Sequence, residues 1–251
     1  MPLASRIIPV ILAKGQQAVK GQRFDSWRSV GQLRQAIRVY EMRQVDELIL
    51  LDIGATPDGK EPDVAFVHEF AGELFMPTCV GGGVKTLDHI RQLLAAGADK
   101  VAINTAAVET PELITEAAHK FGAQAVVVSI DVRCDNVYTR CGTVDTGLDP
   151  VAWAKEVCSR GAGEILLNRV ERDGVLDGYD LDLVESVSGA VGVPVIACGG
   201  AGSYQDFRLA LEAGAHAVAA SAIFHFTEAT PAGAAEYLAQ HGIPVRRTRA
   251  A

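Results

Sequence analysis

The sequence lacks the features that mark a nucleic-acid-binding or membrane protein. Its 23 Lys and Arg are outnumbered by 31 Asp and Glu, and the formal net charge of −8 argues against nucleic acid or an anionic membrane as the main partner. No window approaches the roughly 20 apolar residues of a membrane helix. No basic segment with an apolar run and a small-residue cleavage site precedes the first strand-like segment. We therefore expect a cytoplasmic protein.

Cysteine is also sparse and forms no recognisable site. There are five cysteines, an odd number, and none of them belongs to a Cys-x-x-Cys pair. A structural zinc site or a disulfide framework is therefore not expected. Cys134 and Cys141 fall in one expected loop, where free thiols are favoured over a metal or redox role. We expect neither a metal nor another cofactor.

Length and composition leave room for one large core. The 251 residues are 49% apolar and 22% charged, and a barrel of eight βα units takes about 250 residues. Amphipathic stretches such as 87–96 and 206–213 alternate with short β-rich runs. This alternation predicts a parallel sheet, closed or open. The expected strands are Ile7–Ile11, Glu47–Leu51, Pro77–Val80, Lys100–Asn104, Ala125–Ile130, Glu164–Asn168, Pro194–Ala197 and Ala217–Ser221.

An internal repeat favours the closed form. Residues 76–106 (MPTCVGGGVKTLDHIRQLLAAGADKVAINTA) align without a gap on residues 193–223 (VPVIACGGAGSYQDFRLALEAGAHAVAASAI). The same offset of 117 places 46–50 on 163–167. Two halves of four βα units close naturally into an eightfold barrel, whereas an open sheet would give them unequal environments. We predict an α/β fold, a single (β/α)8 TIM barrel domain over residues 1–251 with a half-barrel repeat.

The repeat also pairs two glycine-rich loops. The third strand of each half ends in glycines, at 81–83 and at 199–202, and the fourth ends in small polar residues, Asn104-Thr105 and Ser221. Glycine lets backbone N–H groups approach an anion closely, and barrel active sites lie where the strands end. A purely steric role for the glycines is the alternative. We expect two phosphate sites facing each other across the barrel mouth, and hence a phosphorylated small molecule with a phosphate at each end.

The order of motifs resembles, from end to end, the cyclase subunit of imidazole glycerol phosphate synthase, HisF. In that family a glutaminase partner (HisH-like) makes ammonia that crosses the barrel from its bottom face. At the top, the ammonia reacts with a bisphosphorylated ribulosyl aminoimidazole nucleotide in a lyase and cyclase reaction of histidine biosynthesis. The resemblance rests on Arg6–Pro9, 19–21, 46–48, 51–53, 80–83, 97–101, 103–107, 161–167, Arg172-Asp173-Gly174, Gly178-Tyr179-Asp180, 199–202 and 223–225.

The resemblance implies a role for particular residues. Asp131, which ends the fifth strand, would be one of two catalytic carboxylates, and Asp99 would contact the glutaminase partner. One phosphate would contact Gly83, Asn104 and Thr105. The other would contact Asp173, Gly174, Gly200, Gly202, Ser221 and Ala222.

A charged ammonia gate is also implied at the bottom of the barrel. Its members would be Arg6, Glu47, Lys100 and Glu164, all of which are present. They stand at the starts of the first, second, fourth and sixth expected strands, where two cations and two carboxylates can pair. A structural ring of salt bridges that closes the barrel floor is the alternative. A gate implies a channel, and a channel implies the glutaminase.

The sequence departs from the family at its chemistry. A second aspartate is expected at the end of the first strand, but this strand reads Ile7-Ile8-Pro9-Val10-Ile11-Leu12, and Leu12 aligns with Asp131. A positioned acid or base contributes roughly 10²–10⁴ in rate, and leucine has no proton to move. Asp52, after the second strand, could substitute only from a neighbouring position. Ser221-Ala222 also reverses the family order of alanine then serine.

Three functions fit these residues. The first is a divergent paralogue, resembling the WbuZ branch, that passes ammonia on for sugar amidation in surface-glycan biosynthesis, with a sugar amidotransferase as a further partner. The second is a working cyclase of histidine biosynthesis with a rearranged acid–base pair. The third is a non-catalytic scaffold that only activates a glutaminase.

Overall fold

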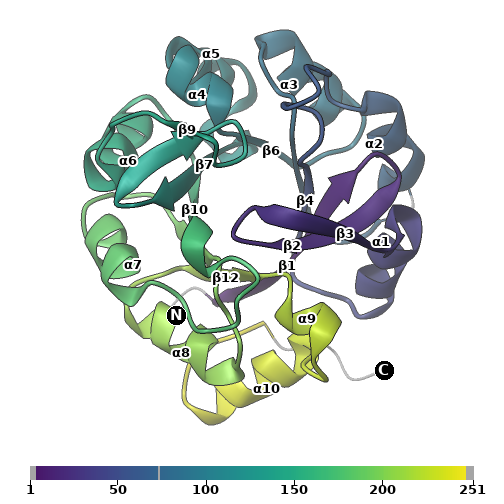
Figure 1. Cartoon of the computed structure of the whole chain (residues 1–251), viewed down its shortest axis with the longest axis vertical. Coiled ribbons are helices and arrows are strands. Elements are labelled where there is room, and N and C mark those ends of the chain that lie inside the picture. Colours follow the sequence, from purple (N-terminus) through teal and green to yellow (C-terminus); the bar gives the residue numbers. More distant parts are fainter. Residues whose placement is uncertain (1–3, 73, 247–251) are drawn as a thin grey trace.

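A computed structural model describes residues 4–72 and 74–246 and shows a closed barrel of eight parallel strands. The strand order β10-β11-β12-β1-β4-β5-β6-β7 closes through pairing of β7 with β10. Figure 1 looks into the ring of strands and shows the helices arranged around it. The barrel strands are β1 (Arg6–Lys14), β4 (Leu48–Asp52), β5 (Thr78–Gly81), β6 (Lys100–Ile103), β7 (Val126–Arg133), β10 (Glu164–Arg169), β11 (Val195–Cys198) and β12 (Ala217–Ala220).

The helices lie outside the barrel, between consecutive strands. They are α1 (Leu33–Met42), α2 (Val64–Ala71), α3 (Leu87–Ala95), α4 (Thr105–Glu109), α5 (Glu112–Phe121), α6 (Pro150–Ser159), α7 (Leu181–Ser188), α8 (Tyr204–Glu212), α9 (Ile223–Phe226) and α10 (Pro231–Gln240). Two 3₁₀ turns, η1 (Ala123–Ala125) and η2 (Val170–Arg172), complete the connections. The predicted eight strands and the closed barrel are confirmed. Residues 1–3 and 247–251 of the single domain that we predicted lie outside the described residues.

Two apolar cores hold the layers together. Successive side chains of a strand point to opposite faces, so Ile8, Val10 and Leu12 of β1 fill the barrel interior while Ile7 and Ile11 pack under the helices. Both faces of the barrel strands are therefore buried. This arrangement explains why the strands are continuous apolar runs without polar alternation.

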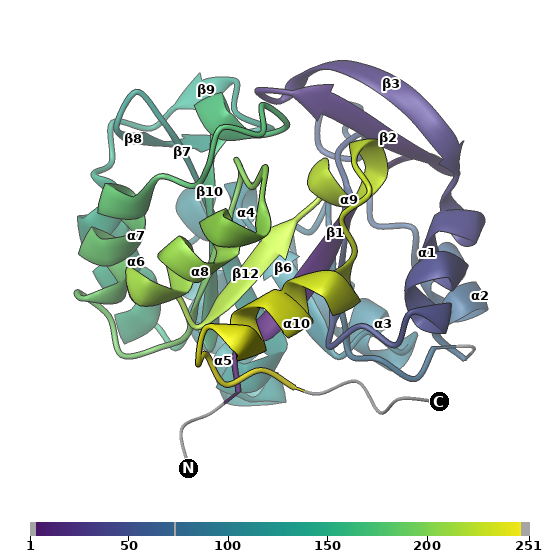
Figure 2. The same cartoon turned by 90° about the horizontal axis from the view of Figure 1, so that it is seen from below.

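The loops after β1 and β7 are longer than the others because each of these strands continues into an antiparallel hairpin. β2 (Gln17–Gln22) and β3 (Asp25–Gln32) follow β1, and β8 (Asn136–Thr139) and β9 (Val144–Asp145) follow β7. Figure 2 shows both hairpins at one end of the barrel. Outside the named strands, Ser5 bridges to Val245. No helix among the described residues is long and apolar enough to cross a membrane.

Candidate active site

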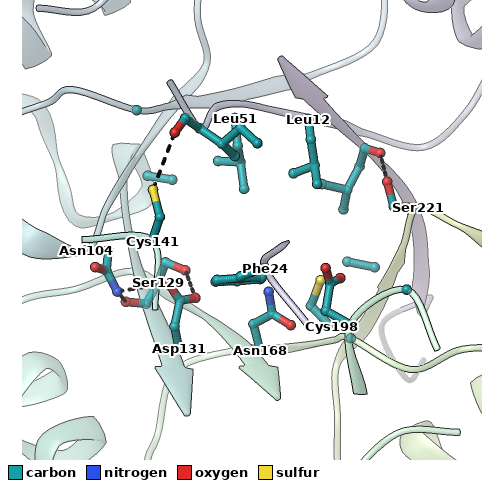
Figure 3. A pocket seen from close by; sticks show the side chains of 18 of the residues that line it. Leu12, Phe24, Leu51, Asn104, Ser129, Asp131, Cys141, Asn168, Cys198 and Ser221 are labelled. Carbon is teal, nitrogen blue, oxygen red and sulfur yellow. Dashed lines mark hydrogen bonds between the residues drawn. The ribbon is translucent and has the colours of Figure 1, made fainter. Parts of the chain in front are cut away.

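A pocket lies over the carboxyl ends of the barrel strands, between the two hairpins (Figure 3). Parallel strands all end at this face, so the loops from both halves of the repeat converge here. The structure brings nine of the ten residues predicted for catalysis and phosphate contact into the lining. These are Gly83, Asn104, Thr105, Asp131, Asp173, Gly174, Gly200, Ser221 and Ala222.

Gly202 is the tenth, and the structure places it elsewhere. Its N–H donates to Oδ2 of Asp206 at 2.9 Å, within the capping box that starts α8 with Ser203. A Cβ at Gly202 would lie 2.2 Å from the carbonyl oxygen of Leu176. The backbone of Gly202 thus packs against the preceding loop, and its N–H group already has a partner.

The first glycine loop approaches the backbone of neighbouring loops too closely for any side chain. Gly82 has a φ of +111°, and a Cβ there would lie 2.3 Å from the carbonyl oxygen of Asp52. Gly83 has a φ of +70° and lies near the carbonyl oxygen of Lys60. Beside this loop, Nδ2 of Asn104 donates to the carbonyl oxygen of Ser129 at 3.1 Å and to Oδ2 of Asp131 at 3.2 Å. Asn104 therefore links the first loop to the predicted catalytic carboxylate.

The second glycine loop is built in the same way. Gly200 has a φ of +118°, and a Cβ there would lie 2.1 Å from the carbonyl oxygen of Gly178. Gly174 has a φ of +71°, and a Cβ there would lie 2.3 Å from the carbonyl oxygen of Gly21. Contacts this short and positive backbone φ angles exclude L side chains. The fold therefore requires glycine at these positions, and the same glycines also leave the backbone free to approach an anion.

We expect Gly200→Ala to lower the free energy of unfolding by about 1–3 kcal/mol, because alanine must adopt a strained backbone angle beside Gly178. Binding of inorganic phosphate should weaken with it, because the loop cannot keep its shape. Gly192→Ala is the matched control, since a Cβ there meets nothing within 4 Å. Denaturant unfolding and phosphate titration measure both effects, and equal results for the two variants would contradict this account.

Lys20 supplies a buried positive charge at the second loop. Its Nζ donates to the carbonyl oxygen of Val10 at 3.1 Å and to Oγ of Ser221. Burial lowers the pKa of Lys20 to about 8, although the nearby Asp173 carboxylate opposes that change. The hydroxyl of Ser221 also donates to the carbonyl oxygen of Val10. Because serine stands at 221 and alanine at 222, the hydroxyl of Ser221 is placed to accept a hydrogen bond from Lys20.

Asp131 is the central acidic group of the pocket. Only 8% of its surface is exposed. Burial raises the pKa of Asp131 to about 7, and the negative charge of Asp173 adds to this increase. The hydrogen bond that the Ser129 hydroxyl donates at 3.1 Å lowers the pKa and so opposes the increase. Burial likewise raises the pKa of Asp173 to about 6, with Lys20 opposing it. A carboxyl group with a pKa near neutrality can accept or donate a proton at physiological pH.

The wall facing Asp131 is apolar. Leu12 of β1 pairs in register with Leu51 of β4, and both line the pocket, as do Phe24 and Trp27 of the first hairpin. Figure 3 shows Leu12 and Leu51 on one side of the pocket and Asp131 on the other. Leu12 and Asp131, which the sequence alignment pairs, thus lie on opposite walls of the pocket. The side chain of Leu12 has no acidic or basic group that could exchange a proton.

Asp52, at the end of β4, also lines the pocket, but its carboxylate is engaged by the turn that follows. It pairs in register with Ala13, so its side chain leaves β4 on the face away from Leu51. Its Oδ1 accepts hydrogen bonds from the N–H groups of Gly54 at 2.9 Å and Ala55 at 3.2 Å. Burial raises the pKa of Asp52, and these two hydrogen bonds oppose the increase. Asp52 stabilises the turn after β4.

Several residues that line the pocket were not predicted from the sequence. Phe24 and Trp27 reach the pocket only because β1 continues into a hairpin, which the strand periodicity did not indicate. Asn168 and Leu51 occupy equivalent positions in the two halves of the repeat, so their difference in polarity was readable from the alignment. The thiols of Cys141 and Cys198 also line the pocket.

At the opposite end of the barrel, the four predicted gate residues form a closed ring. Arg6 binds Glu47 and Glu164, and Lys100 binds the same two carboxylates at 2.9 and 2.7 Å. Burial alone would lower the pKa of Lys100, but attraction to Glu47 and Glu164 raises it. Asp99 is exposed beside this ring, and its Oδ2 accepts a hydrogen bond from the N–H of Thr78 at 2.8 Å. Two cations and two carboxylates thus pair at the floor of the barrel, as both the gate and the structural ring of salt bridges require.

The five cysteines are free thiols. Across residues 4–72 and 74–246, no group of three or more His, Cys, Asp or Glu could hold a metal ion. The site is thus composed of backbone loops, carboxylates, amides and one buried lysine.

Fold and site together define a (β/α)8 barrel of two equivalent halves, with a pocket between two glycine loops and a ring of charges at its base.

Comparisons with known proteins assign the family. A model of the histidine biosynthesis protein family matches residues 6–230. The imidazole glycerol phosphate synthase subunit HisF of Dictyoglomus thermophilum is 47% identical over 249 residues, which cover 97% of this chain and 99% of the relative. HisF of Dictyoglomus turgidum is 46% identical over 249 residues, and HisF of Endomicrobium trichonymphae is 42% identical over 253. The chain belongs to the HisF family, and the resemblance found in its sequence is confirmed.

Proposed function

We propose that this chain is an ammonia-using subunit of the imidazole glycerol phosphate synthase type that serves a pathway other than histidine biosynthesis. A glutaminase subunit docks at the barrel floor beside Asp99, and ammonia crosses the ring of Arg6, Glu47, Lys100 and Glu164. The top-face pocket holds a phosphorylated ligand between the two glycine loops. The proposal includes a cytoplasmic location, which rests on the sequence.

One observation carries the choice of pathway. Leu12 faces Asp131 across the pocket, while the ring at the floor and both glycine loops are kept. General acid–base chemistry between two carboxylates needs both of them. Parts for binding a ligand and for admitting ammonia are therefore present without a carboxylate on β1 that faces Asp131. A WbuZ-like role fits this combination, with ammonia handed to a sugar amidotransferase for surface-glycan biosynthesis.

A working cyclase of histidine biosynthesis is the second candidate, and the raised pKa of Asp131 favours it. With a pKa of about 7, this single carboxyl group can exchange a proton in both directions near neutral pH. The two candidates differ in whether the wild-type chain converts the bisphosphorylated aminoimidazole nucleotide, and a steady-state assay with ammonium salt separates them.

The ammonia route is tested by Lys100→Ala in the complex with the glutaminase subunit of the same organism. Removing this lysine leaves Glu47 and Glu164 with Arg6 alone, so the ring opens. We expect the barrel to stimulate glutamine hydrolysis in its wild-type form, and Lys100→Ala to lose most of this stimulation, by about tenfold. Lys120→Ala, which changes an exposed lysine near the end of α5, should behave like wild type. A glutaminase that hydrolyses glutamine equally with and without the barrel would contradict the route.

A further inference from the structure

The turn of the first hairpin has a backbone conformation that its residues do not favour. Residues 22 and 25 pair across the hairpin, which leaves Arg23 and Phe24 as a two-residue turn with φ angles of +55° and +60°. Such turns usually carry asparagine and glycine, because most other residues lose free energy at positive φ. A turn of this composition needs contacts from outside the hairpin to keep its shape.

Arg133, the last residue of β7, supplies such contacts. Its Nη2 donates to the carbonyl oxygen of Arg23 at 2.9 Å, and its Nη1 donates to the carbonyl oxygen of Gly142 at 2.8 Å. Gly142 lies between β8 and β9, at the turn of the second hairpin. Both acceptors are backbone atoms, so the link depends on the side chain of Arg133 alone. One guanidinium group thus joins the turns of the two hairpins.

The turn that Arg133 holds carries Phe24 into the pocket. Phe24 is part of the lining, and Figure 3 shows its ring inside the circle of pocket side chains. A Cβ at Gly142 would lie 3.0 Å from Cδ2 of Phe24, so the ring also packs against the second hairpin. On the other side of the turn, the N–H of Arg23 donates to the carbonyl oxygen of Asp173 at 2.8 Å. The position of the aromatic ring is therefore fixed from both sides of the turn.

We propose that Arg133 is a positioning residue, which holds the first hairpin across the pocket and keeps Phe24 against a bound ligand. Release of the ligand then requires the hydrogen bond between Arg133 and the turn to break. The planar guanidinium presents two donating edges in a fixed geometry, which the ammonium of lysine does not. That the ligand is phosphorylated rests on the proposed function, whereas the link between the hairpins is a property of the free protein.

Hydrogen exchange of the free protein tests the link. In Arg133→Leu, the amides of residues 17–32 should exchange at least about tenfold faster than in wild type, because two hydrogen bonds from a charged group are lost. Arg133→Lys keeps the charge without the two donating edges and should give an intermediate rate. Arg140→Leu is the matched control, because Arg140 belongs to the same hairpin but its side chain binds Glu109 at 2.7 Å. Its exchange at 17–32 should equal that of wild type.

Ligand release is a readout that a purely structural role would not move. Trp27 lies on the first hairpin and lines the pocket, and Trp153→Phe makes it the sole tryptophan. In that background, stopped-flow fluorescence should show the bisphosphorylated aminoimidazole nucleotide leaving Arg133→Leu at least about tenfold faster than the parent.

The outcomes separate the inference from the proposed function. Equal exchange at 17–32 in Arg133→Leu and wild type would overturn the link between the hairpins. Faster exchange throughout the barrel would show a general structural role instead. Equal release of the nucleotide despite faster exchange at 17–32 would overturn the role of Arg133 in holding the ligand. Failure of the wild type to bind the nucleotide would overturn the proposed function, while the exchange comparison still decides the link.

Discussion

Leu12→Asp is expected to raise the cyclase turnover of this chain at least about 100-fold above the wild-type rate. The new carboxylate would stand at the end of β1, on the wall that faces Asp131. The glycine loops would already hold the bisphosphorylated aminoimidazole nucleotide. What the substitution adds is a second carboxylate that faces Asp131. A steady-state assay with ammonium salt measures the gain.

The position of the added carboxylate should matter more than its presence. Leu51→Asp is the matched control, because Leu51 pairs with Leu12 in register and lies one strand away. Adding Asp131→Asn to Leu12→Asp should remove the new turnover, since the pair is again broken. Equal rates for Leu12→Asp and Leu51→Asp would contradict the assignment of Leu12 as the missing member of the pair.

Asp131→Asn is expected to stabilise the folded protein above neutral pH by up to about 4 kcal/mol. Burial raises the pKa of Asp131 to about 7, whereas in the unfolded chain the carboxyl group has its ordinary pKa near 4. Between these two values the folded state binds more protons than the unfolded state. The free energy of unfolding therefore falls as pH rises from about 4 to about 7, and asparagine at 131 removes this loss.

Denaturant unfolding of both proteins across pH 4 to 8 measures the effect. The two curves should lie close together near pH 4 and separate as pH rises, with Asp131→Asn the more stable. Asp182→Asn, which changes an exposed aspartate of α7 outside the pocket, is the control for the substitution itself. A difference between Asp131→Asn and wild type that does not change with pH would show that Asp131 is ionised in the folded state throughout. It would then not hold a proton near neutrality.

Much of the barrel could be predicted from the sequence because its two halves repeat each other. The aligned glycines at 82–83 and 199–200 fixed the register of both loops, and the charges at the strand starts indicated a ring at the floor. The hairpins were missed because 17–32 is largely polar and carries no apolar periodicity. Their formation depends on β1 and β7 extending beyond the barrel, which is a tertiary feature.

The hydrogen bonds of the site could be predicted from the sequence less well than the fold. The phosphate contact of Gly202 stays a prediction, and the capping box of Ser203 and Asp206, which uses the Gly202 N–H, could be read from the residue spacing. The pairing of Lys20 with Ser221 joins residues 201 positions apart and needed coordinates.

We expect the pocket to bind a bisphosphorylated ligand but to lack one half of an acid–base pair. The most direct test follows binding and turnover together in the wild-type chain, with the bisphosphorylated aminoimidazole nucleotide and ammonium salt. We predict saturable binding of the nucleotide without its cleavage or cyclisation. Measurable wild-type turnover that Asp131→Asn abolishes would contradict the claim and identify a working cyclase of histidine biosynthesis.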